Sequence, residues 1–344
     1  MLKYFRTSFI FSFVGLILAY IVASIYTDST AGIVQYLFIT MVLSVLEISL
    51  SFDNAVVNAK VLETMTPVWR HRFITWGMLI AVFGMRLIFP LAIVSVMTSI
   101  GPWEALMMAA QRPKEYADIM LSSHVQISAF GGSFLLMVAL RFFLDHHKDD
   151  HWIQWIENPL AKLGKLESVQ IGLTVMLILI MTKLINEADQ MKFLIPAIWG
   201  VVVHIIVDGM SSLLKSDDGP GIDLGRASAA SFIYLEVLDA SFSFDGVVGA
   251  FAITNNLFII MIGLSVGAFF VRSLTIFFVE EKTLKSFRFL EHGAFYAILT
   301  LAIMMLLGPF VHIPEWITGV SGAVLIALSI FASIQHKKKS GLEN

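Results

Sequence analysis

The sequence predicts an all-α polytopic membrane protein with about ten transmembrane helices, and three observations lead to this fold class. Hydrophobic residues make up 57% of the 344 residues and charged residues only 14%, whereas soluble domains carry about 25% charged residues. The apolar residues gather in ten runs, most close to the roughly 20 residues that span a bilayer. An acidic motif occurs in two of these runs, which indicates an internal duplication. We therefore expect one membrane domain over residues 1–344.

Short polar segments separate the ten runs and set the order of the predicted spans. The first run follows Lys3 and Arg6 and has no small-residue cleavage site after it, so we expect a retained span rather than a signal peptide. The predicted spans are residues 7–26, 32–59, 73–99, 119–144, 169–184, 193–214, 227–253, 257–279, 292–311 and 316–334. An even number of spans places both termini on the same side of the membrane.

The distribution of positive charge predicts which side that is. If the N-terminus is cytoplasmic, 17 of the 23 Lys and Arg residues fall in cytoplasmic segments. This excess agrees with the positive-inside rule. We therefore expect a multi-pass membrane protein with both termini in the cytoplasm.

The composition excludes several classes of function. The chain has no cysteine, so disulfides, cysteine metal centres and thiol catalysis are excluded. A net charge of −3 shows no basic excess of the kind that nucleic-acid binding needs. No span carries a His-Glu-x-x-His motif, a Ser-Lys dyad or paired protease aspartates, so we expect neither an enzyme nor a cofactor. The expected partners are the lipid bilayer and a transported ion, and the oligomeric state is left open.

The duplicated motif relates the second and seventh predicted spans. The first copy, V-L-E-I-S-L-S-F-D-N-A-V-V, begins at Val45, and the second, V-L-D-A-S-F-S-F-D-G-V-V-G, begins at Val237. Both acids shift by the same amount, 239 − 47 = 192 and 245 − 53 = 192. The next span of each copy has a glycine and an arginine nine positions apart: Gly77 and Arg86, Gly263 and Arg272. We take repeat 1 as about 31–144 and repeat 2 as about 227–311.

The two copies are predicted to run in opposite directions through the membrane. Their motif spans are second and seventh in order, so the chain enters them from opposite sides. Such inverted-topology repeats are typical of secondary transporters, whose sites lie near the midplane between the repeats. The sequence therefore favours a transporter.

We expect both motif helices to be broken. On a continuous helix Glu47 and Asp53 would be about 9 Å apart along the axis and about 240° apart around it, too far to share one ion. Hydroxyl groups can satisfy the backbone groups that a break frees. The serines available for this are Ser49, Ser51, Ser241 and Ser243.

The acidic residues of the motifs form the predicted metal site. The proposed ligands all offer oxygen and are Glu47, Asp53, Asn54, Asp239 and Asp245. Oxygen ligands suit Mn²⁺, Ca²⁺ or Mg²⁺. We expect Glu236 to extend the acidic site, and Arg86 and Arg272 to balance its charge. In the alternative interpretation, these acids only form structural ion pairs with the two arginines.

Two further segments carry titratable side chains. His204 and Asp208 are four residues apart in the sixth span and form a candidate proton relay. The polar segment 145–168 has an amphipathic pattern that predicts an interfacial helix in a cytoplasmic loop. His146, His147 and His151 in that segment suggest either a metal cluster or a solvated loop, and we favour the solvated loop.

The first motif resembles a known family. Residues 47–54, E-I-S-L-S-F-D-N, are similar to the E-x-x-L-S-x-D-N signature of TerC-type membrane proteins, within the LysE-like transporter superfamily. The resemblance implies a bacterial inner-membrane protein linked to metal-ion efflux, particularly of manganese, and to tellurite resistance. By position the family's acidic motif falls on Glu47, Asp53 and Asn54, and its second-repeat aspartate on Asp245.

The chain also departs from that family. Its second aspartate is followed by Gly246-Val247-Val248-Gly249 rather than the family's S-[IV]-P-A, and it has more spans than the shorter TerC proteins. It therefore resembles a longer branch. We expect export of a divalent cation, Mn²⁺ first, with protons as exchange partner. Export of an amino acid or small solute, and a non-transporting role in membrane assembly or stress response, stay open as alternatives.

Overall fold

The computed structural model describes residues 2–148, 150–164, 168–215, 224–311 and 313–339, and all regular structure in them is helical. Helices η1 and η2 are π-helices and the others are α-helices. The elements are α1 (Leu2–Tyr26), α2 (Thr30–Leu50), α3 (Phe52–Thr64), α4 (Pro67–Arg72), η1 (Phe73–Gly77), η2 (Ile80–Ile88), α5 (Phe89–Thr98), α6 (Pro102–Gln111), α7 (Pro113–Ser122), α8 (His124–Phe143), α9 (Gln154–Leu163), α10 (Val169–Leu184), α11 (Glu187–Lys215), α12 (Leu224–Ile253), α13 (Leu257–Glu280), α14 (Thr283–Ser286), α15 (Leu290–Leu307) and α16 (Glu315–Lys339). The predicted all-α class is confirmed.

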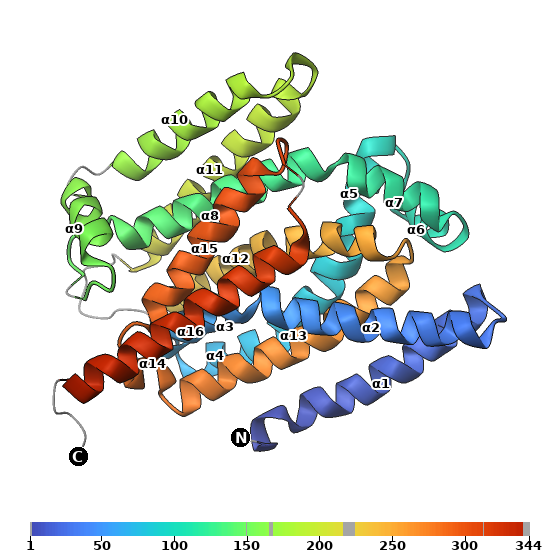
Figure 1. Cartoon of the computed structure of the whole chain (residues 1–344), viewed down its shortest axis with the longest axis horizontal. Helices are drawn as coiled ribbons and strands as arrows, with labels where there is room; N and C mark the ends of the chain where they lie inside the picture. The colour runs from blue at the N-terminus through green and yellow to red at the C-terminus, as the bar shows by residue number, and fades with distance from the viewer. Residues whose placement is uncertain (1, 149, 165–167, 216–223, 312, 340–344) are drawn as a thin grey trace.

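Eight of the ten predicted spans fall on helices long and apolar enough to cross a membrane: α1, α2, the segment Pro67–Thr98, α8, α11, α13, α15 and α16. Of the other two, α10 is a shorter apolar helix of 16 residues, and α12 is a 30-residue helix that carries the second acidic motif. The chain is a multi-pass membrane protein. Figure 1 shows α1 and α10 at opposite edges of the bundle, with α12 and α15 between them.

Helices of the two repeats pack on each other in matching pairs. Helix α13 of repeat 2 packs on α2 and α3, the first motif helices, while η2 of repeat 1 packs on α12, the second motif helix. Helix α15 packs on α3, and α8 packs on α12. Helices α8 and α15, the third spans of the two copies, pack on each other. Each contact that a helix of one repeat makes with the other repeat is thus also made by its equivalent helix, which agrees with the predicted duplication. The inverted orientation of the repeats stays a prediction.

Two glycines let α13 approach α2 closely. A Cβ atom on Gly263 would lie 2.7 Å from Cβ of Leu43, and one on Gly267 would lie 2.5 Å from Cβ of Glu47. The Ser44 hydroxyl donates a hydrogen bond of 2.9 Å to the Gly263 carbonyl across this contact. Glycines four residues apart are a common means of close helix packing in membranes. The contact fixes the position of Glu47.

The predicted break occurs in one motif helix and not in the other. Helix α2 ends at Leu50, Ser51 has φ −105° and ψ 16°, and α3 begins at Phe52. Helix α12 is continuous from Leu224 to Ile253, so the expected break in the second copy is wrong. Within this continuous helix, the Ser241 hydroxyl donates a hydrogen bond to the Val237 carbonyl four residues earlier.

The third predicted span contains π-helical turns. It runs through η1 and η2 into α5, and α4 precedes it directly. Arg86 lies in η2 and its guanidinium donates a hydrogen bond to the Ala81 carbonyl five residues earlier. Segments of π-helix often occur at functional sites. Here η2 holds one of the two arginines that the repeat pattern identified.

The helix predicted in segment 145–168 is present as α9 and is held by a buried carboxylate. Glu157 is fully buried and accepts a 2.8 Å bond from Lys148 Nζ and a 3.1 Å bond from the Ile153 N–H. Two residues of α15 also contact the carboxylate: Tyr296 Oη lies 3.3 Å from Oε1, and His292 Nε2 lies 3.4 Å from Oε2. His146 and His147 are exposed, as expected for a solvated segment, but Glu157 docks the loop onto α15.

We predict that Glu157→Gln lowers the melting temperature at pH 7, at a cost of about 1–3 kcal/mol, because charge-assisted hydrogen bonds are lost. Burial by itself would raise the pKa of Glu157, but hydrogen bonds from His292, Lys148 and Ile153 lower it to about 2. A depressed pKa stabilises the fold above the ordinary value near 4.5, and this contribution is lost as pH falls from there towards 2.

The test of this prediction is thermal unfolding in detergent between pH 3 and pH 7. The wild type should lose stability over this range more steeply than Glu157→Gln. Glu115→Gln is the control, since Glu115 pairs with Arg112 at the surface. Equal melting temperatures for wild type and Glu157→Gln at pH 7 would contradict the role of Glu157.

Candidate functional site

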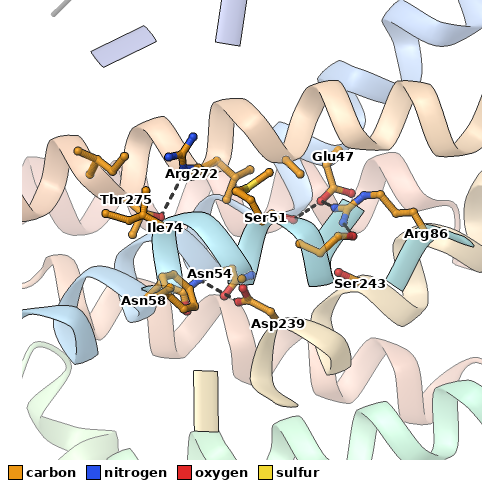
Figure 2. A pocket seen from close by; sticks show the side chains of 17 residues that line it. Glu47, Ser51, Asn54, Asn58, Ile74, Arg86, Asp239, Ser243, Arg272 and Thr275 are labelled. Atoms are coloured by element: carbon orange, nitrogen blue, oxygen red, sulfur yellow. Dashed lines mark hydrogen bonds and ion pairs between the residues drawn. The ribbon is translucent and has the colours of Figure 1, made fainter. Parts of the chain in front are cut away.

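A small polar pocket lies where the two repeats meet. It has a volume of about 50 Å³ and is bounded by α2, α3, the π-helical segment, α12 and α13. Figure 2 shows its polar side chains from both repeats. These are Glu47, Ser51, Asn54, Asn58, Arg86, Asp239, Ser243, Arg272 and Thr275. The pocket is the main candidate site, and we call it the central pocket.

The first repeat contributes one stripe of polar side chains to the central pocket. Glu47, Ser51, Asn54 and Asn58 follow at intervals of four, three and four residues, which places them on one face of a helix. All four are buried. The break at Ser51 therefore does not turn the stripe away from the pocket.

A buried ion pair occupies one end of the pocket. The Arg86 guanidinium pairs with the Glu47 carboxylate, and their side chains are only 2% and 5% exposed. The Ser51 hydroxyl donates a 3.1 Å hydrogen bond to Glu47 Oε1. Figure 2 shows Arg86 and Glu47 facing each other. The pair neutralises both charges, as burial in a low-dielectric interior requires.

The second carboxylate of the pocket, Asp239, is held by amides. Asn58 Nδ2 donates a 2.9 Å hydrogen bond to Asp239 Oδ1. The Oδ1 atoms of Asn54 and Asn58 are buried and have no hydrogen-bond partner among the described residues. A carboxylate with two unsatisfied amide oxygens nearby is suited to hold a cation, because each oxygen can still donate a lone pair.

Glu236 lies next to this group on α12. A Cβ atom on Gly77, which lines the central pocket, would lie 2.6 Å from Glu236 Oε1. The Glu236 Oε1 atom is buried without a hydrogen-bond partner in the described structure. Glu236 thus stands at the edge of the pocket, one helical turn from Asp239.

Three pairs of repeat-equivalent residues meet in the central pocket. Glu47 and Asp239, Ser51 and Ser243, and Arg86 and Arg272 all line it. The repeat alignment placed these residues in one site, but it also placed Asp53 and Asp245 there, and neither of them lines this pocket. It did not identify Asn58 or Thr275. The spacing of four between Asn54 and Asn58 was the signal available for Asn58.

The other pair of motif acids does not face the central pocket. Asp53 lies in the first turn of α3, where its Oδ1 accepts a 3.0 Å hydrogen bond from the Asn54 N–H, and an acid there is favoured by the helix dipole. Asp245 is buried and lines a second pocket. The described residues thus bring two of the four predicted carboxylates together, and nowhere among them do three His, Cys, Asp or Glu side chains gather as a metal site.

Continuity of α12 explains why Asp239 and Asp245 separate. Six residues on an unbroken helix correspond to about 9 Å along the axis and about 240° of rotation. Asp239 and Ser243 therefore face the central pocket, whereas Asp245 faces away from it.

The remaining predicted residues lie outside the central pocket. Ser49 faces α16, since a Cβ on Gly319 would be 2.9 Å from its Oγ. The His204 ring packs on Phe134 at 5.5 Å, and neither of its nitrogens has a hydrogen-bond partner in the described part of the chain. Asp208 pairs with Arg141. A relay between His204 and Asp208 stays a prediction.

Comparison with known proteins gives a family. A family model described as "Protein of unknown function (DUF475)" matches residues 52–340, from the start of α3 through α16. No curated protein matches the chain, and no solved structure does.

We predict strong coupling between Glu47 and Arg86. Glu47→Gln leaves the Arg86 charge buried without its partner, and Arg86→Gln does the reverse, so each should cost about 3–5 kcal/mol. The double variant should lose much less than the sum, because it contains neither charge. Melting temperatures of the purified variants measure this, with Asp189→Asn as the exposed-pair control, expected to cost under about 1 kcal/mol. Additive losses would show that the two residues do not act as a pair.

Proposed function

The chain belongs to the DUF475 family, described as proteins of unknown function, and we propose an activity for it from the central pocket. The protein is a secondary transporter of the bacterial inner membrane that exports a divalent metal cation. Mn²⁺ is the first candidate cargo and protons are the candidate exchange partner. The observation that carries this proposal is a small pocket with two carboxylates, lined by helices of both repeats where the repeats meet.

The ligand chemistry supports a hard or intermediate cation. Asp239 supplies carboxylate oxygens, Asn54 and Asn58 supply unsatisfied amide oxygens, and Ser243 supplies a hydroxyl. Such ligands suit Mn²⁺, Mg²⁺ and Ca²⁺. Ionisable residues in the membrane interior are costly, so a functional role is the default interpretation for them.

The size of the pocket favours an ion over an organic solute. Its volume of about 50 Å³ holds a few water molecules, since one water needs about 10–15 Å³ by this measure. An ion with part of its hydration shell fits this space, and an amino acid does not. We therefore set aside the amino-acid exporter as a candidate.

Glu47 and Arg86 give the site a means to change its charge. While the pair is closed, Glu47 is neutralised and Asp239 is the main acceptor for a cation. If Glu47 leaves Arg86 for a bound cation, two carboxylates offset the two positive charges of the ion. Arg86 would then keep its hydrogen bond to the Ala81 carbonyl, and its uncompensated charge would disfavour this state until the ion leaves. Motion of η2 and α12 relative to each other is the proposed step of alternating access.

We predict that Asp239→Asn abolishes Mn²⁺ flux while the protein remains folded, because amidation preserves the shape of the side chain and removes one charge. The initial rate in proteoliposomes, followed with a metal-quenched dye inside the vesicles, should fall by more than about 100-fold. By comparison, loss of a residue that only supports a metal ligand lowers metal affinity by about 10–100-fold. Asp189→Asn is the matched control, since Asp189 is exposed and pairs with Lys192. Wild-type flux in Asp239→Asn would refute the proposed site.

We also predict that segment 60–72 and the C-terminal Lys337–Lys339 face the cytoplasm, as the positive-inside rule requires. Because the chain has no cysteine, single cysteines can be introduced at Lys60 and Lys338. An impermeant thiol reagent should label them in inverted vesicles and not in intact cells. A cysteine at Lys114 should show the opposite pattern. Labelling of Lys60→Cys or Lys338→Cys from outside intact cells would reverse the orientation.

A further inference from the structure

A second pocket, which we call the distal pocket, lies on the other side of α12 from the central pocket. Its volume is about 210 Å³, larger than that of the central pocket. Helix α12 presents a separate face to it, made by Asp245, Val248, Gly249 and Ala252. The continuous helix α12 therefore serves two pockets with two faces, each carrying one acid of the motif.

The distal pocket contains ligands of a different kind. Its polar side chains are the Asp245 carboxylate, the His124 imidazole at the start of α8, and the buried Thr318 hydroxyl of α16. The Ser128 hydroxyl is 3.2 Å from His124 Nε2, which orients the ring. A Cβ atom on Gly308 would lie 3.0 Å from Cε1 and 3.8 Å from Nδ1 of His124. Glycine at this position therefore keeps the space beside the imidazole free of a side chain.

The position of the distal pocket fits a transport path through the central pocket. His124 begins α8, Gly308 follows the end of α15, and Thr318 lies in the first turns of α16. All three thus lie at the ends of their helices remote from the C-terminus of α16. Between the two pockets, Gly246 presents no side chain towards Glu47, whose Oε2 would be 3.7 Å from a Cβ there. Asp245 of the distal pocket directly precedes Gly246 on the same helix.

We propose that the distal pocket is a second cation site that binds a divalent transition-metal ion. The inference rests on the proposed transport function, which supplies the cation, and goes beyond it by naming a second site and a selectivity. Carboxylate and hydroxyl oxygens bind Mn²⁺ and Mg²⁺ alike, whereas an imidazole nitrogen favours transition metals over Mg²⁺ and Ca²⁺. His124 therefore makes the distal site discriminate between two ions that the oxygen ligands of the central pocket accept alike.

The test is the number of Mn²⁺ ions bound per chain, measured by equilibrium dialysis of the purified full-length protein in detergent. The wild type should bind two. Asp245→Asn and His124→Gln should each bind one, and Asp239→Asn should also bind one. His71→Gln is the matched control and should bind two, since His71 is exposed and outside both pockets. Excess Mg²⁺ should displace one Mn²⁺ from the wild type and none from Asp239→Asn.

The possible results separate this inference from the proposed function. One ion in the wild type that is lost in Asp239→Asn and retained in Asp245→Asn overturns the distal site and leaves the proposed function intact. One ion that is lost only in Asp245→Asn and His124→Gln supports the distal site and refutes binding in the central pocket. No bound Mn²⁺ in the wild type overturns both. Two ions that Mg²⁺ displaces together overturn the selectivity assigned to His124.

Discussion

The buried pair of Glu47 and Arg86 is the constraint on which the rest of the site depends. Two charges within apolar helices are tolerated only when they neutralise each other, so α2 and η2 must hold this geometry. The π-helical turn places the Ala81 carbonyl within reach of the same guanidinium. Gly263 and Gly267 bring α13 against α2 at Glu47 and keep the carboxylate in place. Asp239 is then left as the carboxylate that amides, rather than an arginine, hold.

The two motif helices have similar sequences but differ in structure. Helix α2 gives way to α3 at Ser51, and Asp53 then lies in the first turn of a new helix. Helix α12 continues through the equivalent position, and Asp245 and Asp239 lie on different faces of it. Asp53 and Asp245 both face away from the central pocket, and Asp245 lines the distal pocket.

The segment between the repeats stabilises the ends of the bundle rather than the site. Glu157 of α9 accepts hydrogen bonds from Lys148 and from the backbone of its own loop, and it contacts His292 and Tyr296 of α15. Since α15 also packs on α8 and α3, this dock connects the loop to helices of both repeats. A relative movement of the repeats would therefore act on the contact between Glu157 and α15.

The sequence by itself determined the membrane class, the repeated acidic motif and the helix at α9. These follow from composition, from equal spacing of matched residues and from helical periodicity, none of which depends on packing. Only the tertiary structure decided that α12 is unbroken, that Asp53 and Asp245 face away from the central pocket, and that Asn58 and Glu157 are buried. These features depend on which helices pack against each residue, and composition and spacing do not specify that packing.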